Sequence, residues 1–206
     1  MSDVYLASRS ARRRDLLKQI GVKFEPLMLR LSAPRGADVD ESRHDGESPG
    51  DYVERVAREK ADCALRILGM RALSHKPVLA ADTVVICDDD VLGKPANPDE
   101  AASFLKRLSG RTHEVRTAVA VTSTALQGAQ ALSVVSLSQV TFRELSEAEI
   151  KRYCETAEPY DKAGGYAIQG LAAVFIERLE GSYSGVMGLP LAETAQLLAQ
   201  AGVKVL

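Results

Sequence analysis

Apolar residues recur along this chain with two different spacings, and the changes of spacing predict its elements. Residues 4–7 (VYLA) and residues 22–29 have the pattern of strands, and between them a helix begins at the cap residue Ser10 and runs to about Ile20. Residues 77–87 (PVLAADTVVIC) are nearly all apolar, which is typical of a strand covered on both faces.

Cap and turn residues mark the remaining predicted elements. Residues 29–50 are rich in Ser, Pro, Gly and acidic residues, and we interpret them as a long active-site or surface loop. The other predicted elements are helices beginning at Ser48-Pro49, at Asn97-Pro98 and at Ser146 with Glu149, a hairpin of residues 112–126 and 130–142 split by Gln127-Gly128, a strand from Leu171 to Leu179, and a last helix from Leu189 to Ala201 ended by Gly202.

Strands and helices follow one another in both orders, which predicts an α/β fold. We expect a mixed, elongated central sheet flanked by helices. With 206 residues, the chain is expected to form a single domain over 1–206, with two lobes that share the sheet and a cleft between them.

Composition and charge narrow the functional classes. A net charge of −2 and a pI near 6.0 argue against a general nucleic-acid binder, so no nucleic-acid partner is expected. No apolar stretch approaches the roughly 20 residues that a membrane helix needs, and arginines interrupt the N-terminal apolar run, so neither a membrane anchor nor a secretory signal is expected. Three scattered cysteines suit reduced thiols, and we expect a cytoplasmic protein.

An arginine cluster follows the first predicted strand. On a helix, Arg12 and Arg13 fall on the core-side edge of the first turn, whereas Arg14 points the other way and is expected to face water. Two guanidiniums beside the free N–H groups of a helix N-terminus suit a polyphosphate, and Ser8 and Ser10 add hydroxyl donors. The alternatives are a solvated basic face and, less consistent with the acidic balance of the chain, contact with nucleic acid.

Asp82 lies in the middle of the apolar strand. A carboxylate in such a place either forms an ion pair or performs chemistry, and the sequence leaves both open. Lys94 lies between Gly93 and Pro95, so its ammonium is presented on a stiff segment. Lys60 belongs to the helix after Ser48, where surface charge is an equally good interpretation. Residues 88–90 (DDD) are predicted to form a solvated hairpin turn rather than a metal site.

The segment YDKAGGYAIQG combines three glycines with two polar side chains, Tyr166 and Gln169, that could read a ligand. Gln169 can both donate and accept hydrogen bonds, which suits one edge of a nucleobase. The alternative is a tight connection before the next strand. The segment matches neither a Walker A loop nor a GxGxxG fingerprint, and the three histidines lack the spacing of a zinc site.

Taken together, these segments resemble the Maf family (septum-formation Maf proteins), whose members are nucleoside triphosphate pyrophosphatases. The matching segments span nearly the whole chain in family order: LASRSARRRDLL, DVDE at 38–41, ESPGDYVERVAREKA, LAADTVV, LGKPANPDEA, LSGRTHEVRTAVAV, DKAGGYAIQG and GSYSGVMGLPLAET. The resemblance implies hydrolysis between the α- and β-phosphates, and the DKAGGYAIQG form is similar to that of the branch directed at dTTP and UTP.

The resemblance also implies roles for particular residues. Asp82 corresponds to the general base, which would activate a water for attack on the α-phosphorus. The phosphate-contacting positions are Arg12, Arg13, Lys60 and Lys94, in addition to Ser8 and Ser10, and the positions associated with base preference are Arg12, Thr83 and Gln169. A divalent cation, Mg²⁺ or Mn²⁺, is implied as cofactor, with Glu41 and Asp82 as its predicted ligands. Many members form homodimers, so a homodimer is expected.

Two other functional classes stay open. A regulator of cell division and septum formation would bind a nucleoside triphosphate without needing to turn it over. A nucleotidyl transferase acting on sugar phosphates would need a second anion site, and the sequence suggests none, so this class ranks last.

Overall fold

The computed structural model describes residues 3–30, 38–123 and 131–205. The strands are β1 (Val4–Leu6), β2 (Phe24–Pro26), β3 (Val78–Cys87), β4 (Asp90–Leu92), β5 (Thr112–Thr122), β6 (Leu132–Phe142) and β7 (Ile176–Glu180). The α-helices are α1 (Ala11–Gln19), α2 (Pro49–Met70), α3 (Pro98–Leu108), α4 (Glu147–Cys154), α5 (Tyr183–Met187) and α6 (Leu191–Gln200). Short 3₁₀ helices cover Glu158–Asp161, Ala163–Gly165 and Leu171–Phe175.

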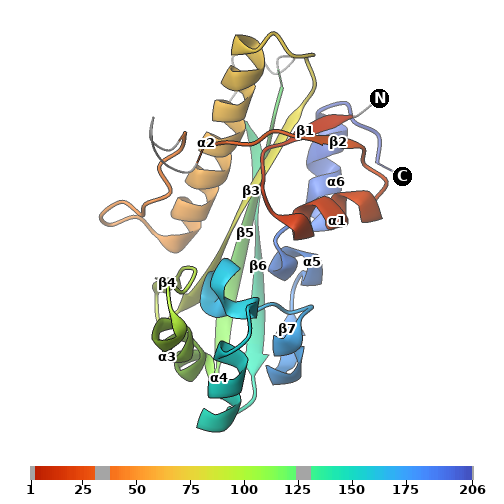
Figure 1. The fold of residues 1–206 in the computed structure, drawn as a ribbon. Helices are drawn as coiled ribbons and strands as arrows, with labels where there is room; N and C mark the ends of the chain where they lie inside the picture. The colour runs from red at the N-terminus through yellow and green to blue at the C-terminus, as the bar shows by residue number, and fades with distance from the viewer. Residues whose placement is uncertain (1–2, 31–37, 124–130, 206) are drawn as a thin grey trace. The chain divides into compact units, whose positions relative to one another are not determined.

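The strands form one seven-stranded mixed sheet, which confirms the predicted α/β class. Its order is β2-β1-β3-β5-β6-β7, with β4 paired to β3 (Figure 1). β1 is parallel to both β2 and β3, as expected for strands joined through helices, whereas β4 and β7 are antiparallel to β3 and β6. β5 and β6 are neighbours, as the predicted hairpin requires, although its Gln127-Gly128 turn lies outside the described residues.

The chain divides into two compact units. The first contains residues 1–82, 117–135 and 188–206, and the second contains residues 83–116 and 136–187. The predicted single domain with a cleft between two lobes stays a prediction, and each unit is described by itself.

In the first unit, local signals in the sequence set the helix starts. The Ser10 and Ser48 side chains accept hydrogen bonds from backbone N–H groups of α1 and α2, as the sequence predicted. α2 buries its apolar stripe, including Val53, Val56 and Ala61. A hydrogen bond from Arg13 to the Gly188 carbonyl connects α1 to the segment before α6.

In the second unit, an aromatic cluster forms the centre of the core. The His113, Phe142 and Tyr166 rings meet edge to face, and Phe175 packs against Phe142 and Tyr153. α3 contributes the predicted apolar face of Ala101, Leu105 and Leu108. The predicted capping box of Ser146 and Glu149 begins α4.

The predicted strand over 171–179 is wrong in its first half. Leu171–Phe175 forms a 3₁₀ helix, and the strand begins only at Ile176. The physical reason is the Glu158 carboxylate, which accepts hydrogen bonds from the backbone N–H groups of Leu171 and Ala172. These donors are therefore not available to a sheet ladder, and the chain turns instead.

Three smaller features are the turn after β3, the state of the cysteines and the character of the helices. Asp88 and Asp89 form the predicted exposed turn between β3 and β4, both with positive φ. All three cysteines are free and buried, as expected for reduced thiols. The described part of the chain contains no helix long and apolar enough to cross a membrane.

Candidate functional site

The side chain of Arg13, in the first turn of α1, is held in a defined position by two hydrogen bonds. Its Nε donates to the carbonyl of Gly188 at 2.7 Å, and its Nη1 donates to Ser8 Oγ at 3.2 Å. Ser10 Oγ accepts the backbone N–H of Arg13 at 3.3 Å, so both predicted serines take part in the same turn. The guanidinium is thus oriented by groups from two distant parts of the first unit.

Asp82 forms an ion pair in the first unit. Lys60 Nζ lies 2.8 Å from Asp82 Oδ1 and 3.1 Å from Glu41 Oε1. The Lys60 and Asp82 side chains are 12% and 15% exposed, whereas Glu41 is 45% exposed. One ammonium therefore joins a strand carboxylate and a loop carboxylate, at a place that solvent still reaches through Glu41.

Arg13 lies within electrostatic range of this ion-pair cluster. Burial lowers the pKa of Arg13, and the charges of Asp82 and Glu41 act in the opposite direction, while Arg12 adds to the lowering. The charges of Asp82 and Glu41 therefore act on Arg13, which lies within electrostatic range of the two ion pairs of Lys60. The turn that holds Arg13 and the ion pairs of Lys60 with Asp82 and Glu41 thus both belong to the first unit.

The neighbours of this cluster differ in part from expectation. Arg14, expected to face water, is half-buried. Asp38, in the acidic segment that contains Glu41, is bonded to the side chain and backbone N–H of Arg30. Among the acids of this segment, Glu41 is therefore the one that contacts Lys60.

The predicted site residues of the second unit lie on connected segments. Gly164 donates its N–H to the Gly93 carbonyl at 2.9 Å, beside Lys94, and Gly165 lies against Pro95. Gly164 has φ +69°, and a Cβ there would lie 2.9 Å from atoms of Val85, so only glycine fits. Lys94 and Gln169 are exposed, whereas Thr83, which directly follows Asp82 in β3, is half-buried.

Tyr166 does not read a ligand, contrary to expectation. Its side chain is buried, and its hydroxyl lies 2.7 Å from Nε2 of His113, which is also buried. The pair anchors the glycine-rich segment in the core, so of the two polar side chains Tyr166 and Gln169, Gln169 is the exposed one. Burial lowers the pKa of His113 to about 4, from an ordinary value of 6.5.

This buried histidine predicts a loss of stability in mild acid. His113 is neutral in the folded protein down to about pH 4 but takes up a proton below pH 6.5 once the chain unfolds, so acid favours the unfolded chain. Because the pKa of His113 differs in this way between the folded and unfolded chain, the free energy of unfolding falls by about 2 kcal/mol between about pH 7.5 and about pH 5. Urea titrations at several pH values measure the free energy of unfolding of wild type and of two variants. His113→Gln should lose most of the pH dependence. His75→Gln, which replaces an exposed histidine, should keep it. Equal slopes for wild type and His113→Gln would contradict the assignment.

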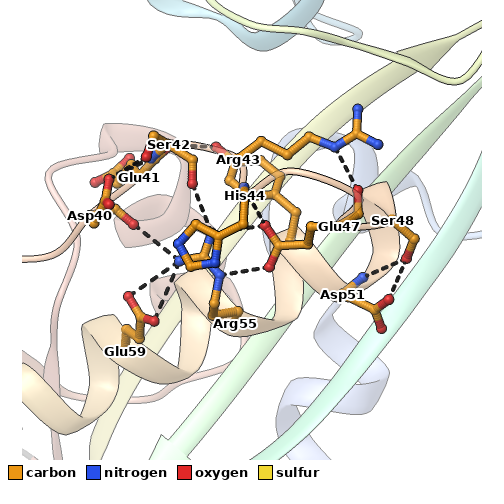
Figure 2. A network of polar contacts seen from close by, with 11 residues as sticks. Asp40, Glu41, Ser42, Arg43, His44, Glu47, Ser48, Asp51, Arg55 and Glu59 are labelled. Atoms are coloured by element: carbon orange, nitrogen blue, oxygen red, sulfur yellow. Dashed lines mark hydrogen bonds and ion pairs between the residues drawn. The ribbon is translucent and has the colours of Figure 1, made fainter.

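A polar network beside Glu41 was not predicted from the sequence. Tyr52 and Arg55 of α2 hold the segment that precedes the helix, and Glu47 pairs with Arg55 at 2.6 Å (Figure 2). Tyr52 donates its hydroxyl to the Glu41 carbonyl at 2.8 Å, and burial, together with the charges of Asp82 and Glu41, raises its pKa to about 12. The available signal was the i, i+3, i+7 spacing of Tyr52, Arg55 and Glu59, which places three polar side chains on one helix face.

The donor set for a metal is small. Across residues 3–30, 38–123 and 131–205, no group of three or more His, Cys, Asp and Glu side chains is arranged to hold an ion. The two predicted ligands, Glu41 and Asp82, nevertheless converge on a cation, the Lys60 ammonium. Mg²⁺ keeps several waters and binds through one or two carboxylates plus phosphates, so this pair fits such an ion.

Comparisons with known proteins identify the family of this chain. The profile of the Maf-like protein family matches residues 3–201. A protein of Aromatoleum aromaticum named dTTP/UTP pyrophosphatase is 53% identical over 97% of this chain and 95% of its own length. Proteins of the same name from Nitrosospira multiformis and Cupriavidus metallidurans are 52% and 50% identical, each over 98% of this chain and over 96% and 98% of their own lengths. The chain belongs to the Maf-like family.

Proposed function

We propose that this protein is a nucleoside triphosphate pyrophosphatase that hydrolyses dTTP and UTP to the nucleoside monophosphate and pyrophosphate. The observation that supports it best is the Lys60–Asp82 ion pair, with the guanidinium of Arg13 within electrostatic range, in a chain about half identical to enzymes named for that reaction. The names of these relatives do not favour a regulator that binds nucleotide without turnover.

Asp82 is proposed as the general base. Its carboxylate takes a proton from a water whose oxygen attacks the α-phosphorus, the bond between that phosphorus and the α,β-bridging oxygen breaks, and pyrophosphate leaves. Lys60 contacts one carboxylate oxygen, Oδ1, and holds the group in place. A carboxylate has a second oxygen that can accept the proton.

The cations are proposed to bind the phosphates. The positive charges of Arg12, Arg13 and Lys60 exceed the negative charges of Asp82 and Glu41 by one. A triphosphate brings roughly four negative charges. Lys94 and the hydroxyls of Ser8 and Ser10 are proposed to add donors. A divalent cation, Mg²⁺ or Mn²⁺, bound by Glu41 and Asp82 would neutralise more of the phosphate charge.

The proposal is tested by incubating the protein with dTTP, UTP, CTP and purine triphosphates, with and without Mg²⁺, and measuring monophosphate and pyrophosphate. We expect equal amounts of the two products from dTTP and UTP, and only with the metal. Release of orthophosphate would reject the proposed bond cleavage. Tight binding without products would favour the regulator.

Gln169 is proposed to read the base, together with Arg12 and Thr83. Glutamate at this position can accept hydrogen bonds but no longer donate them to a pyrimidine carbonyl. We expect Gln169→Glu to lower the ratio of kcat/KM for UTP to kcat/KM for CTP by about 10-fold, while Gln196→Glu, on the exposed face of α6, leaves the ratio unchanged. An unchanged ratio in Gln169→Glu would remove Gln169 from base selection.

The quaternary structure and location stay predictions. We propose a homodimer, which sedimentation can test, and a cytoplasmic location, which fits three reduced thiols.

A further inference from the structure

Arg55 of α2 makes an unusually large set of contacts with the acidic segment. Its Nε and Nη2 donate to the two carboxylate oxygens of Glu47 at 2.6 and 3.0 Å. Its Nη1 and Nη2 also donate to the backbone carbonyls of Asp40 and Ser42, at 3.2 and 2.8 Å. Figure 2 shows the guanidinium between the segment and α2, with Glu59 on the helix side.

These contacts fix the backbone on both sides of Glu41. The carbonyls of residues 40 and 42 bind Arg55, and the carbonyl between them accepts the hydroxyl of Tyr52. Three consecutive carbonyls are therefore held by two side chains of one helix. The Glu41 carboxylate then lies 3.1 Å from Lys60 Nζ, on the same helix.

An arginine is needed for this arrangement. The planar guanidinium directs several N–H donors along fixed directions, so it can bind a carboxylate in a bidentate manner and still reach two carbonyls, which an ammonium cannot do. The Arg55 and Glu47 side chains are 19% and 11% exposed, so the pair is largely shielded from water. Arg55 lowers the pKa of Glu47 to about 2, and the contact therefore persists across the neutral and mildly acidic range.

We propose that Arg55 is a positioning residue: it fastens residues 40–47 to α2 and thereby holds the Glu41 carboxylate beside Lys60 and Asp82. The inference rests on the proposed function, in which Glu41 acts at the phosphates and their cation. Arg55 acts through the backbone of the segment and does not itself touch the nucleotide.

Arg55→Met and Arg58→Met form a matched pair for the test. Both remove a guanidinium from α2, but Arg58 pairs with Glu54 of the same helix. Amide hydrogen exchange in residues 38–48, measured without nucleotide, should accelerate by about 10-fold or more in Arg55→Met and stay unchanged in Arg58→Met. The kcat/KM for dTTP should fall by about 10-fold or more in Arg55→Met alone, with partial recovery in Arg55→Lys, which keeps the charge.

A double-mutant cycle separates positioning from a general loss of stability. If Arg55 acts through Glu41, adding Arg55→Met to Glu41→Gln should cost much less than adding it to wild type. Three results would each overturn the inference. They are additive losses of kcat/KM in the double mutant, unchanged amide exchange in Arg55→Met, and faster amide exchange in Arg55→Met with wild-type kcat/KM. If the wild-type protein releases no pyrophosphate from any triphosphate, the proposed function and the catalytic part of the inference are rejected. The amide exchange data would still decide whether Arg55 fastens residues 40–47 to α2.

Discussion

Replacing Asp82 with asparagine should lower kcat for dTTP and UTP by about 100-fold or more. Asparagine has nearly the same shape as aspartate but cannot take the proton of the attacking water. The KM should change much less than kcat, because the arginines and lysines proposed to hold the phosphates remain, and Glu41 and the amide oxygen introduced at position 82 can still bind the cation. Steady-state kinetics on both nucleotides, with pyrophosphate as the measured product, give the two constants separately.

The same variant should remain folded. Removing one partner of a buried ion pair is costly when the other charge is left alone, but Lys60 also contacts Glu41, which is 45% exposed. Asp89→Asn is the matched control, since Asp89 lies in the exposed turn after β3 and asparagine tolerates its positive φ. Wild-type turnover by a folded Asp82→Asn protein would reject the assignment of the base.

Short-range signals in this sequence predicted local structure well. Each cap serine, together with the residue three positions on, defines the start of a helix within a few residues, and α1, α2 and α4 begin where Ser10, Ser48 and Ser146 placed them. The apolar strand around Asp82 was also predictable, because both faces of β3 are covered except near its centre. In these places the local sequence and the tertiary structure favour the same conformation.

One failure occurs where a distant side chain decides the outcome, and another where a helix is too short to show a period. The segment LAAVF has the composition of a strand, but Glu158 binds its first two N–H groups, and a 3₁₀ helix results. The short helix α5 was missed because it is a single turn, although Ser182 caps it by accepting the N–H of Gly185. No periodicity reports such a contact in advance.

The candidate site was predictable in its residue types but not in its supporting contacts. Charge and family resemblance singled out Arg13, Asp82 and Lys60, and the structure pairs Lys60 with Asp82 within electrostatic range of Arg13. The groups that orient them, such as the Gly188 carbonyl for Arg13, lie far away in the sequence. Every residue has a backbone carbonyl, so the sequence does not indicate which one binds Arg13, and this part of the site could not be predicted.

Replacing Arg13 should have the second large effect on activity. Arg13→Met removes a guanidinium that the Gly188 carbonyl and Ser8 Oγ orient within electrostatic range of Asp82, so kcat/KM for dTTP should fall by about 100-fold or more. Arg13→Lys separates charge from geometry: an ammonium keeps the positive charge but cannot keep both contacts and a bidentate phosphate, so we expect a loss of about 10-fold or more.

Arg14→Met is the control, because it removes the same group from the next position of α1. If the loss were only a matter of net positive charge at the helix N-terminus, Arg14→Met would match Arg13→Met, and Arg13→Lys would behave like wild type. If orientation decides, the order of kcat/KM is wild type and Arg14→Met first, then Arg13→Lys, then Arg13→Met. The measured order therefore distinguishes a diffuse basic surface from a guanidinium held in place for one phosphate group, which are two of the three interpretations that the arginine cluster allowed from sequence alone.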